Sequence, residues 1–138
     1  MTDAASADVP ARLAFATGRL NRRLRSAGGV LSHGLLSALA TVSKQGPLRL
    51  AELSQLESVS APSTTRLVAE LEVKGLVTRA TDPADGRAIL ISITPTGVET
   101  IAAARAARAA MVAELFESLE PKEIAAITAA LPALEKML

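Results

Sequence analysis

The stretch SAPSTTRLVAELEVKGLVTRATDPADGRAILISITPTG, residues 60–97, carries the strongest structural signals in this chain. Its first part predicts a helix over residues 61–74, because apolar side chains recur at helical spacing. The side chains expected to face inward are Leu67, Val68, Leu71 and Val73. The first turn instead carries short polar or charged side chains, which are Ser63, Thr64, Thr65 and Arg66. Polarity at the N-terminal end is typical of a helix that meets bases in duplex DNA.

The second part of the stretch predicts a β-hairpin. Gly75 is suited to end the helix, and residues 76–80 and 88–93 have the pattern of strands. The inward positions of the second strand are expected to be Ile89, Ile91 and Ile93. Residues 81–87, TDPADGR, have the composition of a turn, so the tip of the hairpin should protrude.

Helices are expected on the N-terminal side of this stretch. A short helix over residues 50–57 is separated from the helix at 61–74 by a tight break, which predicts a helix-turn-helix. Further upstream, one helix should end at Gly28-Gly29. A second should begin after Ser32, a favourable N-cap, and end at Gly46-Pro47.

On the C-terminal side, Thr94-Pro95 predicts the start of a helix that runs to about Ser118. Its Ala-rich part, residues 102–110, favours close helix packing in a dimer or reflects helix propensity alone. Pro121 should open a last helix, which Pro132 is expected to kink or split. The terminal helices carry more apolar side chains than thin helices bury alone, which favours a dimer.

The expected fold is therefore mainly α with a small β-hairpin, in a single domain of 138 residues. Residues 1–9 should form a flexible arm, and residues 48–94 a winged helix-turn-helix lobe. Residues 10–47 and 95–138 should supply dimerisation and scaffold helices.

Composition restricts the function. The absence of Cys and the single histidine, His33, argue against disulfides, metal sites and cofactors. The chain shows no nucleophile paired with a histidine and no phosphate loop, so we expect no enzyme. Only Phe15 and Phe116 are aromatic, which favours duplex DNA over unpaired bases. No apolar run approaches a bilayer span, and we expect a soluble, cytoplasmic protein without membrane contact.

Residues 60–97 resemble the signature of the MarR family of transcriptional regulators, in which a Thr-Arg recognition helix leads to Gly-Leu-Val, an Asp-x-Arg wing tip and Thr-Pro-x-Gly. The resemblance extends more loosely over residues 12–134. It implies a homodimer with one winged helix-turn-helix per subunit on an inverted repeat of duplex DNA. It also implies repression relieved by a small effector.

Several residues are candidates for DNA contact, with alternatives for some. Ser60 is a contact or only a helix cap, or both. Arg66 contacts DNA or pairs with Glu70 one turn later. The full set of candidates is Arg49, Ser60, Ser63, Thr64, Thr65, Arg66, Arg79, Asp85 and Arg87.

Arg87, at the tip of the expected hairpin, is the strongest of these candidates because a hairpin can deliver it into a narrow minor groove. Asp85 should orient Arg87 or close the turn. The family often has a second Arg where this chain has Gly86. It often has a capping Thr or Ser where this chain has Arg49, so a cap is lost unless Arg49 contacts phosphate instead.

The charge distribution is compatible with more than one function. Residues 9–51 contain seven basic residues and no acid. This excess of positive charge indicates either a solvated helix face or an anion-binding surface. Residues 48–94 contain five basic and six acidic residues, so DNA binding must depend on their placement. The alternatives are a dimeric winged-helix adaptor and a DNA binder without sequence preference.

The resemblance implies a pocket for the effector, and the candidate lining residues are Arg19, His33 and Leu36. For His33, a packed or capping role is the favoured alternative.

Overall fold

The computed structural model describes residues 8–26, 29 and 31–137. The helices are α2 (Val9–Ser26), α3 (His33–Gln45), α4 (Leu50–Glu57), α5 (Ala61–Val73), α6 (Pro95–Phe116) and α7 (Pro121–Lys136). The strands are β1 (Leu48–Arg49), β2 (Val77–Asp82) and β3 (Asp85–Ile93). The fold is thus the expected helical one with a small sheet. Most of the expected N-terminal arm and the predicted stop at Gly28 lie outside the described residues.

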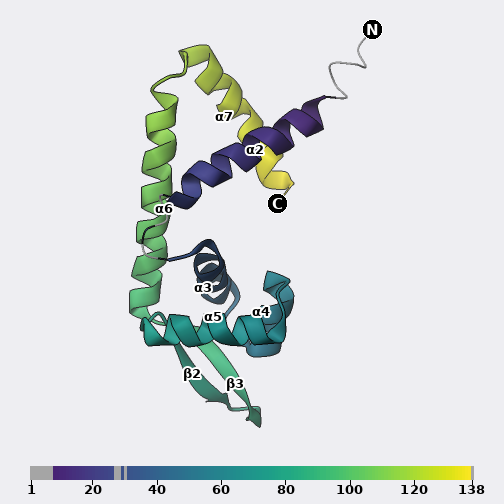
Figure 1. Ribbon diagram of the computed structural model, residues 1–138, viewed down its shortest axis with the longest axis vertical. Helices are drawn as coiled ribbons and strands as arrows, with labels where there is room; N and C mark the ends of the chain where they lie inside the picture. The colour runs from purple at the N-terminus through teal and green to yellow at the C-terminus, as the bar shows by residue number, and fades with distance from the viewer. Residues whose placement is uncertain (1–7, 27–28, 30, 138) are drawn as a thin grey trace.

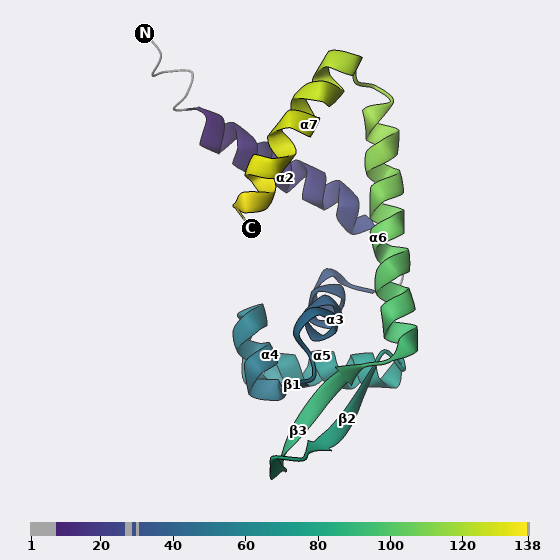
Figure 2. The ribbon, with the colours of Figure 1, turned by 180° about the vertical axis from the view of Figure 1, so that it is seen from behind.

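The long helix α6 connects two ends of the molecule (Figure 1). At one end α2 and α7 cross each other, and at the other α3, α4 and α5 gather above the sheet. The β2–β3 hairpin projects away from the helices, as the view from behind also shows (Figure 2). No described helix is long and apolar enough to cross a bilayer.

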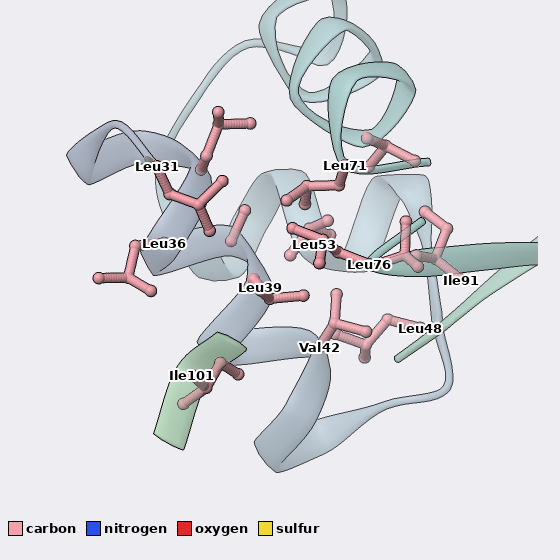
Figure 3. Close-up of a cluster of buried hydrophobic side chains, with 14 of the residues drawn as sticks. Leu31, Leu36, Leu39, Val42, Leu48, Leu53, Leu71, Leu76, Ile91 and Ile101 are labelled. Carbon is pink, nitrogen blue, oxygen red and sulfur yellow. The ribbon is translucent and has the colours of Figure 1, made fainter. Parts of the chain in front are cut away.

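The hydrophobic core lies in the lobe, where α3 packs against α4, α5 and the sheet (Figure 3). One leucine from each of the three helices, together with one isoleucine from β3, has no exposed surface; these residues are Leu39, Leu53, Leu71 and Ile91. Each follows the apolar spacing that predicted its helix or strand. Burial of such side chains stabilises the fold by about 1.5–3 kcal/mol each.

The ends of α3 and α5 are set by local hydrogen bonds, as the sequence predicts. The Ser32 hydroxyl accepts the Leu35 N–H at 3.3 Å. At the end of α5, Gly75 has a φ of +71°, its N–H reaches the Glu72 carbonyl, and the Leu76 N–H reaches the Leu71 carbonyl. This is a Schellman motif, which turns the chain sharply from α5 into β2.

The connection between α4 and α5 is fixed by polar contacts. Ser58 adopts the left-handed conformation, with φ of +53°, and ends α4. The Ser54 hydroxyl donates to the Val59 carbonyl at 2.7 Å. Glu57 accepts the hydroxyl of Thr41 at 2.5 Å, which ties the turn to α3. The helix-turn-helix is therefore held against the scaffold helix as well as by its own core.

The sheet has three strands in the order β1-β3-β2, all antiparallel. The two-residue strand β1, in which Leu48 pairs with Ile91, was not predicted, because two residues are too few to show a period of two. The hairpin is longer than predicted, and only Pro83 and Ala84 lie between its strands. The expected seven-residue turn is therefore wrong.

Two further expectations fail, and one alternative of a third is excluded. Val73 is 87% exposed, because the last turn of α5 has run past the core. Ile89 is 43% exposed, because β3 by this point has passed beyond the helices into the wing. The last helix is not split at Pro132, since α7 continues to Lys136, and a kink at Pro132 stays a prediction.

Gly97 allows α6 to pack closely on the start of β2. A Cβ added at Gly97 would overlap the Leu76 carbonyl oxygen and lie 2.7 Å from Ile93 Cγ1. The Thr94 side chain fixes this contact, since its hydroxyl donates to the Gly75 carbonyl at 2.7 Å and accepts the Gly97 N–H at 3.0 Å. The start of α6 is thus joined to the end of α5.

We predict that Gly97→Ala lowers the free energy of unfolding by about 1–3 kcal/mol, because the added methyl meets backbone that cannot move alone. Urea denaturation measures this. Gly18→Ala is the matched control, since a Cβ there meets nothing within 4 Å and should stabilise α2 slightly. Equal effects of the two substitutions would contradict the close approach.

Candidate nucleic-acid interface

The N-terminus of α5 presents small polar side chains. The Ser60 hydroxyl accepts the Ser63 N–H at 3.3 Å and donates to the Ser63 hydroxyl at 2.9 Å, so Ser60 is the helix cap. Pro62 has no N–H to offer. Because of these two residues, few backbone donors remain free at this helix end, and the exposed hydroxyl and guanidinium groups become its main polar features.

The two neighbouring threonines of α5 have different environments. Thr64 is 1% exposed and donates to the Ser60 carbonyl at 3.1 Å, so its proposed contact with DNA is wrong. The cause is helical geometry, because Thr64 lies one turn before Val68 on the core-facing side. Thr65 is exposed, and its hydroxyl donates to the Ala61 carbonyl at 3.0 Å, which leaves the oxygen free to accept.

Arg66 is exposed and extends along α5 toward its start. Its Nη2 lies 3.5 Å from the Ser63 hydroxyl, at the limit of a hydrogen bond. The alternative pairing with Glu70 is not observed, since Glu70 instead lies 4.0 Å from Lys74 Nζ. The guanidinium therefore has no acidic partner within the lobe.

The wing tip carries Arg87 on an irregular part of β3. Thr81 pairs with Ile89 and Asp82 with Asp85, so the register shifts and residues 86–88 lie between the two pairs. The Asp85 carboxylate accepts the Arg87 N–H at 3.0 Å, which is the turn-closing role predicted for it. The Arg87 side chain is exposed.

Arg49 has an ionic partner within the protein. Its Nε and Nη2 lie 2.9 and 2.5 Å from Asp82 Oδ2, at the end of β2. Its side chain makes no cap, yet its backbone N–H donates to Glu52 at 2.7 Å, which supplies half of a capping interaction. The expected loss of the cap is therefore only partial.

Arg79 is also engaged within the lobe. Its Nε lies 2.7 Å from a carboxylate oxygen of Glu72, although the N–H does not point at that oxygen, so the contact is ionic without a well-formed hydrogen bond. The side chain is 27% exposed. Arg79 thus joins the base of the wing to the end of α5.

Charge pairing explains how a lobe with a net acidic balance keeps basic groups available. Residues 48–94 are all described, and three of their five basic residues are in ion pairs. All six acids are engaged by lobe or scaffold groups through the contacts given above. The two basic residues without an acidic partner in the described lobe are Arg66 and Arg87.

The effector candidates divide into two places. His33 and Leu36 line a hollow of about 250 Å³ between α3 and α6. Arg19 lies elsewhere, with its guanidinium 5.6 Å from the centre of the Phe15 ring on α2. His33 is exposed at the first position of α3, and Ser32 provides the cap, so a packed or capping role for His33 is wrong.

The same hollow contains two residues that were not predicted. Arg105 and Arg108 face it from α6, and the Arg108 Nε is buried without a hydrogen-bond partner in the described chain. Their spacing of three residues places both on one face of the helix. That spacing, in an otherwise Ala-rich segment, is the sequence signal that could have identified them.

Comparisons with known proteins agree on one family. The model of the MarR family matches residues 31–89. A helix-turn-helix-type transcriptional regulator of Mycobacterium bovis is 40% identical over an alignment of 104 residues, with 71% of this chain and 73% of that protein covered.

Solved structures share the fold. A transcriptional regulator protein of Pseudomonas aeruginosa has a TM-score of 0.85 at 25% identity, with 97% of this chain and 96% of that chain covered. A mutant MepR of Staphylococcus aureus, bound to an oligodeoxyribonucleotide, has a TM-score of 0.71 at 17% identity, with 94% and 96% covered.

The pair formed by Arg49 and Asp82 should make stability depend on pH. The Ala84 N–H, first, and then Arg49 hold the pKa of Asp82 below its ordinary value of 3.8. A carboxyl whose pKa is lowered by folding stabilises the fold above its unfolded pKa, and that contribution is lost as the pH falls through the folded pKa.

We therefore predict that the wild type melts at a higher temperature than Asp82→Asn from pH 7 down to about pH 4, and that the difference shrinks below that value. Circular dichroism melts across this range measure it. A difference that stays constant down to pH 2.5 would show that the ionised carboxylate does not contribute.

Proposed function

The chain belongs to the MarR family of transcriptional regulators and has its DNA-binding winged-helix fold, and from this premise we propose that it is a sequence-specific repressor that binds an inverted repeat as a homodimer. The protein is a DNA-binding regulator and not an enzyme. The observation that carries the proposal is the pairing of charges in the lobe, which leaves Arg66 and Arg87 available.

The two arginines lie on different elements, and each element suits a different part of the DNA. Arg66 follows the half-buried Ser63 and the exposed Thr65 on α5, the helix expected to enter the major groove. Arg87 lies on the projecting hairpin, which suits a minor groove or the phosphates beside it. Recognition of one half-site therefore combines base-edge contacts from α5 with electrostatic contacts from the wing.

A homodimer is supported by the apolar surface of the terminal helices. Neither α2 nor α7 has a buried residue within its described length. Between them lies an apolar hollow of about 430 Å³, lined by side chains that include Leu13, Leu134 and Met137. A second copy would cover this surface, and sedimentation equilibrium should give twice the 14.2 kDa mass of the chain. A monomer at micromolar concentration would contradict the dimer.

Two-fold symmetry determines the form of the DNA site. The two recognition helices of a dimer enter successive major grooves, so half-sites about 10 base pairs apart in inverted orientation are expected. Such a dimer would act in the cytoplasm, on duplex DNA. The adaptor alternative is less well supported, because an adaptor gives no reason to leave Arg66 and Arg87 unpaired while every acid in the lobe is engaged.

A small anionic effector is the proposed signal. The hollow between α3 and α6 presents His33, Arg105 and Arg108, and none of the described residues that line it is acidic. A carboxylate there would supply the acceptor that the buried Arg108 Nε lacks. Small carboxylic acids should raise the melting temperature of the wild type and not that of Arg108→Gln. The absence of any stabilisation across such a series would remove the effector from the proposal.

The selection of duplexes from a random pool by the purified protein tests the proposed function. An enriched inverted repeat, bound at least about 10³-fold better than a scrambled control, is the outcome expected of a regulator. Weak binding that depends steeply on salt and shows no enrichment would favour a DNA binder without sequence preference. The absence of binding to any duplex would favour the adaptor.

We predict that Arg66→Ala and Arg87→Ala each weaken binding to the selected duplex about ten-fold or more. Arg87→Ala should also reduce the slope of log affinity against log salt by about 1, because one phosphate contact is lost. Fluorescence anisotropy at several salt concentrations measures both effects.

Lys122→Ala is the control for these variants, since Lys122 is 80% exposed at the start of α7 and pairs with Glu120. It should leave affinity and salt slope unchanged. Wild-type affinity in both arginine variants would contradict the assignment of α5 and the wing as the DNA-binding surface.

A further inference from the structure

The ion pair between Arg49 and Asp82 joins two parts of the lobe that are far apart in sequence. Arg49 precedes α4, and its backbone pairs with Leu90 in the centre of the sheet. Asp82 is the last residue of β2 before the two-residue turn. The Asp82 side chain is 10% exposed, whereas the Arg49 side chain is 43% exposed. The carboxylate is therefore shielded from solvent, while the Arg49 side chain that binds it is partly exposed.

Both oxygens of Asp82 are in use, and each serves a different element. Oδ1 accepts the Ala84 N–H at 2.9 Å, which closes the turn at the wing tip. Oδ2 accepts two N–H groups of Arg49. Because Oδ1 is held by the Ala84 N–H and Oδ2 by the guanidinium, the carboxylate is held in direction as well as in position. Arg49 thereby fixes the point from which the turn begins.

Beyond Asp82 the wing has little else to hold it. Residues 83–87 are all exposed, and the side-chain hydrogen bonds described for them stay within the turn. The register shift leaves residues 86–88, including Arg87, outside the regular ladder. The other ion pair of the wing, between Arg79 and Glu72, lies nearer its base. Arg49 is thus the outermost side-chain link between wing and helices in the described lobe.

We propose that Arg49 is a positioning residue, which tethers the wing through Asp82 so that Arg87 and α5 meet one DNA site together, and does not itself bind phosphate. The inference rests on the proposed function of this lobe in DNA binding. A fixed wing loses less conformational freedom when it binds, so the tether increases affinity without contacting the DNA. This role replaces the phosphate contact expected of Arg49 from its sequence position.

The sign of the effect of Asp82→Asn distinguishes the two roles. Removal of a negative charge from a DNA-binding surface, with release of Arg49, should strengthen DNA binding if Arg49 serves as a phosphate ligand. The tether predicts the opposite, about five-fold weaker binding, because the charge-assisted link is lost. Asn keeps an amide oxygen that can accept the Ala84 N–H, so the turn itself should persist.

The experiment compares wild type, Arg49→Gln, Asp82→Asn and the double variant on the duplex selected by the wild type, or on the labelled random pool where no sequence is enriched. The tether predicts similar losses in both single variants and no further loss in the double variant, since each removes the same link. Additive losses, or tighter binding by Asp82→Asn, would overturn it.

A second measurement does not require DNA. Backbone ¹⁵N relaxation of the free protein should show lower order parameters for residues 84–88 in both single variants than in the wild type. Melting curves and α3 order parameters serve as controls that the lobe remains folded. Unchanged order parameters for residues 84–88 would overturn the proposed tether even if DNA affinity falls. Failure of the wild type itself to bind any duplex would contradict the proposed function and leave this measurement valid.

Discussion

The burial of one face of α3 is the interaction on which the rest of the lobe depends. Leu39 and Val42 belong to one buried cluster with Leu53 of α4, Leu71 of α5 and Ile91 of β3, and α3 contacts all three of these elements, so one helix fixes their positions. Interiors packed in this way do not deform gradually. The recognition helix and the wing are consequently parts of one body, although each is attached to it by a different surface.

Electrostatic pairing then determines what that body can do. The net charge of the lobe gives little indication of DNA binding, because acids outnumber basic residues. Placement matters more than the total, since three acids pair with three of the basic residues and the other three accept hydrogen bonds from neutral groups, which leaves Arg66 and Arg87 without an acidic partner in the lobe. Such pairs contribute little to stability when exposed. Their main effect here is on which charges remain available to a polyanion.

The helices and the order of the elements could be predicted from the sequence, because helical spacing, caps and glycine stops are local signals. Helix α4 has the predicted bounds, and α5 differs by one residue. Strand β1 was missed, since its pairing with β3 is a long-range contact that leaves no local pattern. Thr64 was misassigned because its polarity was given more weight than its spacing, although it lies four residues before Val68 and seven before Leu71, on the inward face of the helix. The partner of Arg49 is 33 residues away and could not be inferred from either segment alone.

Helix α6 has 22 residues and therefore a length of about 33 Å, and one of its ends is fixed to the lobe by Thr94 and Gly97. A rod anchored in this way acts as a lever. A tilt of about 5° at its anchored end displaces its far end by about 3 Å, given that length. In the proposed dimer, whose two chains would be joined at their terminal helices, the displaced end of α6 is instead the one that carries the lobe. A small change in the angle of α6 then alters the spacing between the two wings, and with it the fit to a fixed helical repeat of DNA.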